Sequence, residues 1–114
     1  MFNLSQIGIK KRIANDPYYR FQSLSEVAIA VKLGVKIDVN QASVDDWLRL
    51  PGFSIHQARS LVDLVGMGVQ LVCLEDVAAA ISVPVQRLKP LESILHFEYY
   101  HPLSPLSPQK VNPN

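Results

Sequence analysis

Helix-breaking residues recur along this chain so often that only short helices fit between them. Apolar residues follow helical spacing in several stretches, and these stretches meet stop signals at Asn15-Asp16-Pro17, Gly34, Pro51-Gly52 and Gly66-Met67-Gly68. Proline ends a helix because it lacks the amide hydrogen, and glycine ends one because it adopts the left-handed backbone at little cost. This punctuation predicts an all-α fold of stacked, short helical hairpins.

Helix-start signals precede several of the same stretches. Ser54 is placed as an N-cap, and Ser23 with Glu26 and Ser43 with Asp46 each have the three-residue spacing of a capping box. Together the signals predict helices over about residues 4–14, 24–33, 44–50, 55–65, 74–81 and 85–95, with Pro90 bending or ending the last one early and residues 37–40 extended.

The chain also contains an internal repeat. Residues 23–35 and 73–85 align without gaps and share five identical positions. Both copies carry an acid near the helix start, and both meet a breaker at the same place, which is Gly34 in the first copy and Pro84 in the second. We interpret the chain as helical hairpins that bury each other's apolar faces.

The length of 114 residues suits one domain, which we place at residues 1–101. Apolar residues make up 48% of the chain, which is enough to fold without disulfides or metals. Residues 102–114 have proline at every third position at first, which is typical of an extended segment, and we expect a disordered tail there. A docking motif for a proline-binding domain is the alternative interpretation of this tail.

The sequence also gives an expectation for where in the cell the protein is found. No apolar run approaches the roughly 20 residues that a membrane span needs, and the first residues lack the basic start and apolar block of a secretion signal. The single cysteine, Cys73, cannot form an internal disulfide and has no basic neighbour that would make it reactive. We therefore expect a soluble protein in the reducing cytoplasm.

Charge is divided unevenly along the chain, although the net charge is only +1. Residues 1–36 hold six basic and two acidic side chains, a net charge of +4 that includes the run Lys10-Lys11-Arg12. Residues 37–101 hold four basic and eight acidic side chains, a net charge of −4. A basic first third joined to an acidic remainder is the main electrostatic feature of the sequence.

Residues 37–97 resemble the helix-hairpin-helix domain of bacterial competence DNA-uptake receptors, the ComEA-like family. The resemblance rests on the Asn40-Gln41-Ala42-Ser43 start, the Leu50-Pro51-Gly52 hairpin, the helix with Ala58 that follows, and the later Leu74-Glu75-Asp76-Val77. It implies a tandem helix-hairpin-helix fold. It also implies binding of duplex DNA without sequence preference, because hairpin amides at the start of the second helix hold a phosphate.

Carried over to this chain, the resemblance gives a phosphate-binding site in the central hairpin, to which the basic run near the N-terminus would add charge. The candidate DNA-binding residues are Gly52, Phe53, Ser54, His56, Gln57, Arg59, Lys10, Lys11 and Arg12.

The sequence departs from the family pattern at both hairpins. Ser54 stands where a second glycine is usual, and its side chain is able to occupy the amide donors that a phosphate would need. The second hairpin, residues 82–85, has no glycine, and Pro84 removes an amide hydrogen. The alternative function is a protein-docking module that binds no nucleic acid. The segment Lys36-Ile37-Asp38-Val39-Asn40, the later Glu75-Asp76-Val77 and a leucine-rich helix ending at Phe97 are similar to the small extrinsic helix-hairpin-helix subunit of photosystem II, and this second resemblance supports that alternative.

Other sequence features give no evidence of catalysis or metal binding. The three histidines, His56, His96 and His101, have no metal-ligand spacing, and the adjacent acids in residues 45–46 and 75–76 suit first helical turns. Trp47 falls on an apolar helix face and is expected in the core. We expect no enzyme activity, no cofactor and no small-molecule substrate. The tyrosine pairs at 18–19 and 99–100 are candidates for a contact surface or for packing between the chain ends.

Overall fold

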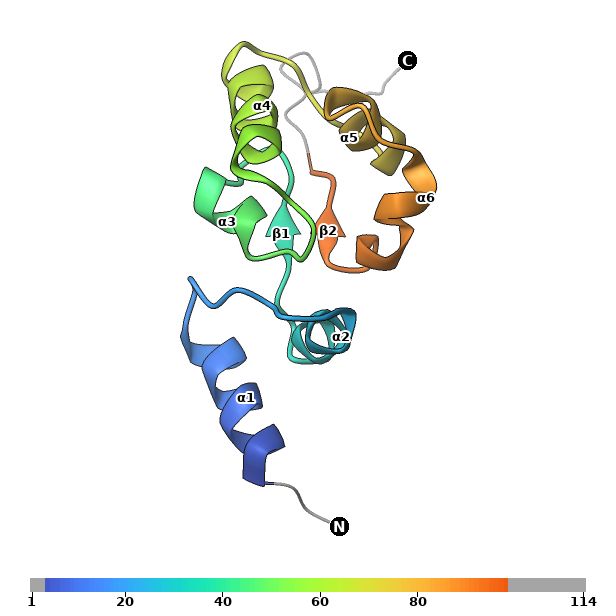
Figure 1. Ribbon diagram of the computed structural model, residues 1–114. Helices are drawn as coiled ribbons and strands as arrows, with labels where there is room; N and C mark the ends of the chain where they lie inside the picture. The colour runs from blue at the N-terminus through green and yellow to red at the C-terminus, as the bar shows by residue number, and fades with distance from the viewer. Residues whose placement is uncertain (1–3, 99–114) are drawn as a thin grey trace, which may run out of the picture.

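The computed structural model describes residues 4–98, and the predicted tail and Tyr99–Tyr100 lie outside this range. The fold is mostly helical, as predicted (Figure 1). Its elements in chain order are α1 (Leu4–Asn15), α2 (Leu24–Lys32), β1 (Ile37–Asp38), α3 (Val44–Leu48), α4 (Ile55–Gly66), α5 (Leu74–Ala80), α6 (Val85–Leu88), the 3-10 helix η1 (Lys89–Leu91) and β2 (Leu95–His96).

Serine caps begin the helices as predicted. Ser43 and Asp46 form a complete capping box: Ser43 Oγ accepts from the Asp46 amide at 3.1 Å, and Asp46 Oδ2 accepts from the Ser43 amide at 2.9 Å. Ser23 Oγ accepts from the Glu26 amide at 3.3 Å at the start of α2, but the predicted capping box is incomplete there, because the Glu26 carboxylate accepts from the Gln22 amide instead of the Ser23 amide. Local capping therefore sets where these helices begin.

Two helical hairpins form the centre of the fold. The α3–α4 hairpin turns at Gly52, where φ is +91°, and the α5–α6 hairpin turns at Ser82, where φ is +58°. A short parallel pair of strands holds the two hairpins together, with Ile37 opposite Leu95 and Asp38 opposite His96 (Figure 1). The extended residues at 37–38 were predicted, but this pairing was not.

The last predicted helix is wrong in its extent. Helix α6 ends at Leu88, η1 follows, and Leu95 belongs to β2 rather than to a helix. Pro90 explains the early end, as the sequence predicted, because it cannot donate the backbone hydrogen bond that would continue an α-helix. Helix α3 likewise ends at Leu48, two residues before the predicted end.

The two copies of the repeat begin alike. Glu26 Oε1 accepts from the Gln22 amide at 2.8 Å, and Asp76 Oδ2 accepts from the Val72 amide at 2.9 Å. Each acid thus binds the amide just before the N-cap of its helix. The equivalence predicted for the helix starts is confirmed.

The copies end differently, so the predicted equivalence of Gly34 and Pro84 is wrong. Gly34 has the left-handed backbone, with φ of +85°, but the matching residue after α5 is Ser82. Pro84 instead caps the N-terminus of α6. The reason is steric, because the proline ring fixes φ near −65° and excludes it from a left-handed position.

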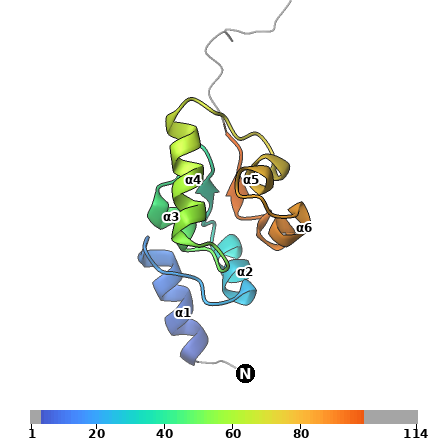
Figure 2. The same cartoon turned by 45° about the horizontal axis from the view of Figure 1, so that its top comes forward.

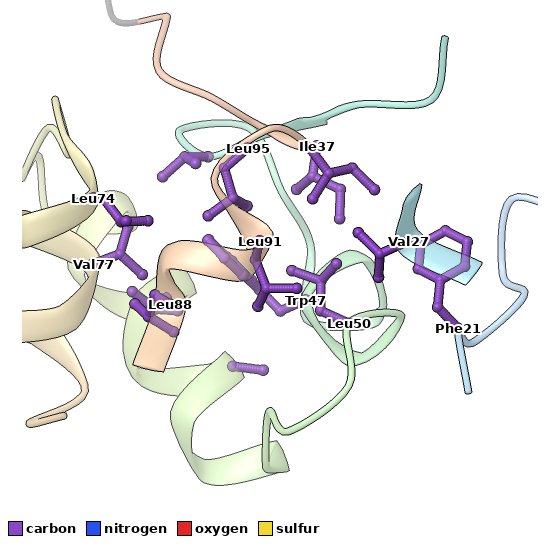
Figure 3. Packing of buried hydrophobic residues seen from close by; sticks show 14 of the residues in the cluster. Phe21, Val27, Ile37, Trp47, Leu50, Leu74, Val77, Leu88, Leu91 and Leu95 are labelled. Atoms are coloured by element: carbon purple, nitrogen blue, oxygen red, sulfur yellow. The ribbon is translucent and has the colours of Figure 1, made fainter. Parts of the chain in front are cut away.

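The apolar core lies between the hairpins and the strand pair (Figure 3). Trp47 is fully buried, as predicted, and its ring stacks on that of Phe53 with centroids 5.2 Å apart. Leu88 and Leu91 enter from the second hairpin, and Ile37 enters from β1 (Figure 3). Neither hairpin could bury its apolar face without the other.

A buried cation ties the N-terminal helices to the first hairpin. Arg49, 7% exposed, donates from Nε to the Tyr19 carbonyl at 2.8 Å and from a terminal nitrogen to the Asp16 carbonyl at 3.3 Å. Its guanidinium lies 4.8 Å from the centroid of the Phe21 ring, and the Phe21 amide donates to the Arg49 carbonyl at 2.8 Å. Burial lowers the pKa of the Arg49 guanidinium from its ordinary value.

No helix within residues 4–98 is both long and apolar enough to cross a membrane.

Candidate nucleic-acid interface

The central hairpin packs on the core through two of its side chains and exposes its turn to solvent. Leu50 and Phe53 fix it to the core, Leu50 by burial and Phe53 by its ring stack on Trp47. Gly52 and Ser54 are exposed at the turn, and an added Cβ at Gly52 would meet nothing within 4 Å. The hairpin backbone is therefore rigid but accessible from solvent.

A second capping box closes the start of α4. Ser54 Oγ accepts from the Gln57 amide at 3.1 Å, and Gln57 Oε1 accepts from the Ser54 amide at 3.0 Å. Ser54 thus occupies one backbone amide donor in the first turn of α4. The amides of Ile55 and His56 have no hydrogen-bond partner within residues 4–98, and they point out of the positive end of the helix dipole.

The second hairpin lies directly beside the first. A small hollow of about 70 Å³ between them is lined by Gly52 and Phe53 from one side and by Val83 and Arg87 from the other. Gln57 and Arg87 are each the third residue after their N-caps, Ser54 and Pro84, and both line this hollow. Arg87 was not among the site residues predicted from the sequence, although its position three residues after Pro84 was the available signal.

The basic run does not form one face. Consecutive residues on an α-helix point about 100° apart, so Lys10, Lys11 and Arg12 diverge around α1. Lys10 lines a hollow against α2, and the Arg12 guanidinium lies 5.1 Å from the centroid of the Tyr19 ring. Lys11 is exposed.

Arg12 is connected to the hairpin through Tyr19 and also through Asp16, whose amide donates to the Arg12 carbonyl at 2.8 Å and whose carbonyl accepts from Arg49. The Tyr19 ring meets Phe21 edge to face with centroids 6.0 Å apart, and the Tyr19 carbonyl accepts from Arg49 in the chain segment just before the hairpin. Arg12 is therefore the residue of the basic run for which a chain of contacts leads to the α3–α4 hairpin.

Charge is sorted along the helices of the paired hairpins. Arg59 stands in the second turn of α4 and Arg87 in α6, close to the turns at Gly52 and Ser82. On α4, the exposed Asp63 lies toward the other helix end, about 12 Å from the first residue and four residues beyond Arg59. Glu75 and Asp76 likewise begin α5, one helix length from its turn. After α6, Glu92 pairs with Lys89 at 3.8 Å.

The described residues hold no group of three metal-binding side chains, and His56 and His96 belong to no such cluster. Asp46 is engaged in the α3 capping box, so it is not one of a free pair of carboxylates with Asp45. Cys73 is a free thiol at the N-cap position of α5 and makes no side-chain capping bond there.

Comparison of the chain with models of protein families, with curated proteins and with solved structures gives no match.

Proposed function

We propose that this protein binds duplex DNA weakly and without sequence preference, through the backbone phosphates, and carries out no catalytic step. The arrangement of charge on the paired hairpins carries the proposal: Arg59 and Arg87 stand near the turns, while Asp63 and the acids of α5 stand at the other helix ends. Phosphate binding needs cations and amide donors together, with carboxylates kept away.

The amide donors in this proposal are those of Ile55 and His56. The 12-residue helix α4 directs its positive dipole end at the exposed hairpin, where a phosphate oxygen would accept from these two groups. Arg59 lies one turn further along α4 and supplies a fixed positive charge. Arg87 supplies a second cation from the neighbouring hairpin, which suits a second phosphate.

The basic run contributes less than the sequence suggested. Lys11 and Arg12 remain candidates for long-range attraction of the DNA, but Lys10 lies in the hollow between α1 and α2. The proposal keeps the cytoplasmic location expected from the sequence, which suits a protein with one free thiol.

Alanine variants of the two hairpin arginines test this proposal. Binding of a labelled duplex is followed by fluorescence anisotropy as salt is raised. We expect Arg59→Ala and Arg87→Ala each to weaken binding and to reduce the salt slope by about one unit. Glu75→Gln is the matched control, because Glu75 begins α5 one helix length from the turn at Ser82 and the loss of its charge should change affinity little. Arginine variants that bind as the wild type does would contradict the proposal.

Protein docking is the second candidate function, and one specific observation favours it. The Ser54–Gln57 capping box occupies two backbone amides at the first hairpin, and Pro84 has no amide to offer at the second. If no duplex binds at about 50 mM salt with protein on the order of tens of micromolar, docking becomes the better account.

A further inference from the structure

The upper end of the molecule in Figure 1 carries an acidic hollow with apolar walls. It measures about 430 Å³ and lies beside the C-terminal end of α4, where Asp38 and Glu98 stand with Val65 and Val69. Met67, in the same loop as Val69, is 73% exposed, and Val69 itself is 42% exposed. This end therefore presents apolar surface next to two carboxylates.

Hydrogen bonds from one side chain hold this hollow in shape. Asn40 donates from Nδ2 to the Leu71 carbonyl at 2.8 Å and to the Glu98 carbonyl at 3.0 Å, and its Oδ1 accepts from the Leu71 amide at 2.9 Å. Asp38 Oδ1 accepts from the Asn40 amide at 3.2 Å. The strand end, the α4–α5 loop and the chain after β2 are thus fixed to one another, so the backbone that carries the two acids is preorganised.

The opposite end carries a hollow of the complementary kind. Between α1 and α2, about 270 Å³ is lined by Lys10, Ile29, Lys32 and Leu33. Leu33 is 43% exposed, so this hollow also presents apolar surface, here beside two lysines. Figures 1 and 2 both place α1 and α2 at the end of the molecule away from the α4–α5 loop.

We propose that the acidic hollow of one copy binds the lysine-rimmed hollow of a second copy, so that the protein associates head to tail. Each hollow pairs exposed apolar side chains with two like charges, and the two sets of charges have opposite sign. A second copy is the occupant that covers both hollows with one kind of contact, in which the acids of one copy face the lysines of the other. Because the two surfaces differ and lie at opposite ends, a dimer formed in this way still has an acidic hollow free at one end and a lysine-rimmed hollow free at the other.

The proposal predicts weak, salt-sensitive association. The rim charges are exposed, so added salt screens their attraction, and hollows of this size support a small interface. It does not depend on the proposed DNA binding, because association is measured with no DNA present. The chain's own residues beyond Glu98 and an unrelated basic partner are the other occupants that the test must separate.

Sedimentation velocity of the full chain over a range of concentrations provides the test. We expect the average mass to rise with concentration at about 50 mM salt and to fall back toward the monomer near 500 mM salt. Two variants that change the charge of one hollow each are made at exposed side chains that have no structural hydrogen bonds. One is Lys10→Glu with Lys32→Glu, and the other is Gln41→Lys with Glu98→Lys.

Each variant alone should associate at least about tenfold more weakly than the wild type, because like charges then face one another across the contact. An equimolar mixture of the two should associate again, because each altered hollow then meets one of opposite charge. Circular dichroism confirms that both variants keep the wild-type fold. Three results would overturn the proposal: a monomer at every concentration, as an occupied hollow would give; association that survives in either variant alone; or a mixture that fails to associate.

Discussion

Arg49 donates from Nε to the backbone carbonyl of Tyr19 at 2.8 Å, and through this bond a buried cation joins the N-terminal helices to the paired hairpins. The Tyr19 and Asp16 carbonyls lose a charged donor when this side chain is replaced. We expect Arg49→Met, which keeps the apolar stem, to lower the free energy of unfolding by about 1–3 kcal/mol in urea titrations. Arg59→Met, at an exposed position, should change it by less than about 0.5 kcal/mol. Equal effects of the two substitutions would show that Arg49 does not hold the halves together.

The turn at Gly52 gives a second prediction about stability. Its φ of +91° is a backbone conformation that β-branched residues resist, so Gly52→Val should destabilise the fold by roughly 1–3 kcal/mol although no atom lies near the new side chain. Gly66 lies in α4 with an ordinary helical backbone and open space around it, so Gly66→Ala should stabilise the fold by about 0.5–1 kcal/mol. Thermal unfolding of both variants checks this, and an unchanged melting temperature for Gly52→Val would argue against the hairpin.

Helix starts were predictable because capping is local. Ser43 and Asp46 stand three residues apart, and the hydrogen bonds between them depend on little else in the chain. The pairing of β1 with β2 was not predictable, because each strand has two residues and its partner lies far away in sequence. The same holds for Arg49, whose acceptors precede it by some thirty residues.

At the candidate site, too, local features were predictable from the sequence and contacts between distant segments were not. The prediction that the Ser54 side chain occupies a backbone amide at the start of the second hairpin helix is confirmed, because a cap acts on its own first turn. The idea of one basic face including Lys10 came from adjacency in sequence, which on a helix separates side chains rather than gathering them. Arg87 was not predicted because the packing of the two hairpins brings it beside Gly52 and Phe53, and no short sequence motif indicates that packing.

Removing the cap at Ser54 should separate its effect on stability from its effect on binding. Ser54→Gly frees the Gln57 amide, and the loss of an N-cap to glycine costs only a few tenths of a kcal/mol. Under the proposed function, duplex affinity should rise about threefold or more, since a phosphate gains one charge-assisted hydrogen bond. Ser43→Gly removes the equivalent cap of α3 and should leave affinity unchanged. A parallel change in the two variants would mean that the hairpin amides do not touch phosphate.

The phenol of Tyr19 makes stability depend on pH in the alkaline range. Burial, followed by the hydrogen bond to Glu26 at 2.8 Å, raises the pKa of Tyr19 above its ordinary 10.0. A raised pKa means that the protonated phenol stabilises the fold fully below about pH 10 and that this contribution is lost as pH rises through the folded-state pKa. The stability difference between wild type and Tyr19→Phe should therefore be constant from pH 7 to 9 and shrink above pH 10. Tyr18→Phe, at a side chain 69% exposed, should show no such change.

The salt dependence of duplex binding by the wild-type protein tests the central claim most directly. If the paired hairpins hold phosphates, a labelled duplex of arbitrary sequence should bind at about 50 mM salt, and the logarithm of the binding constant should fall linearly with the logarithm of the salt concentration. The slope should correspond to roughly two to four phosphate contacts, and a second duplex of different sequence should give the same line. Absence of binding at protein concentrations on the order of tens of micromolar, or binding that does not weaken with salt, would contradict the account.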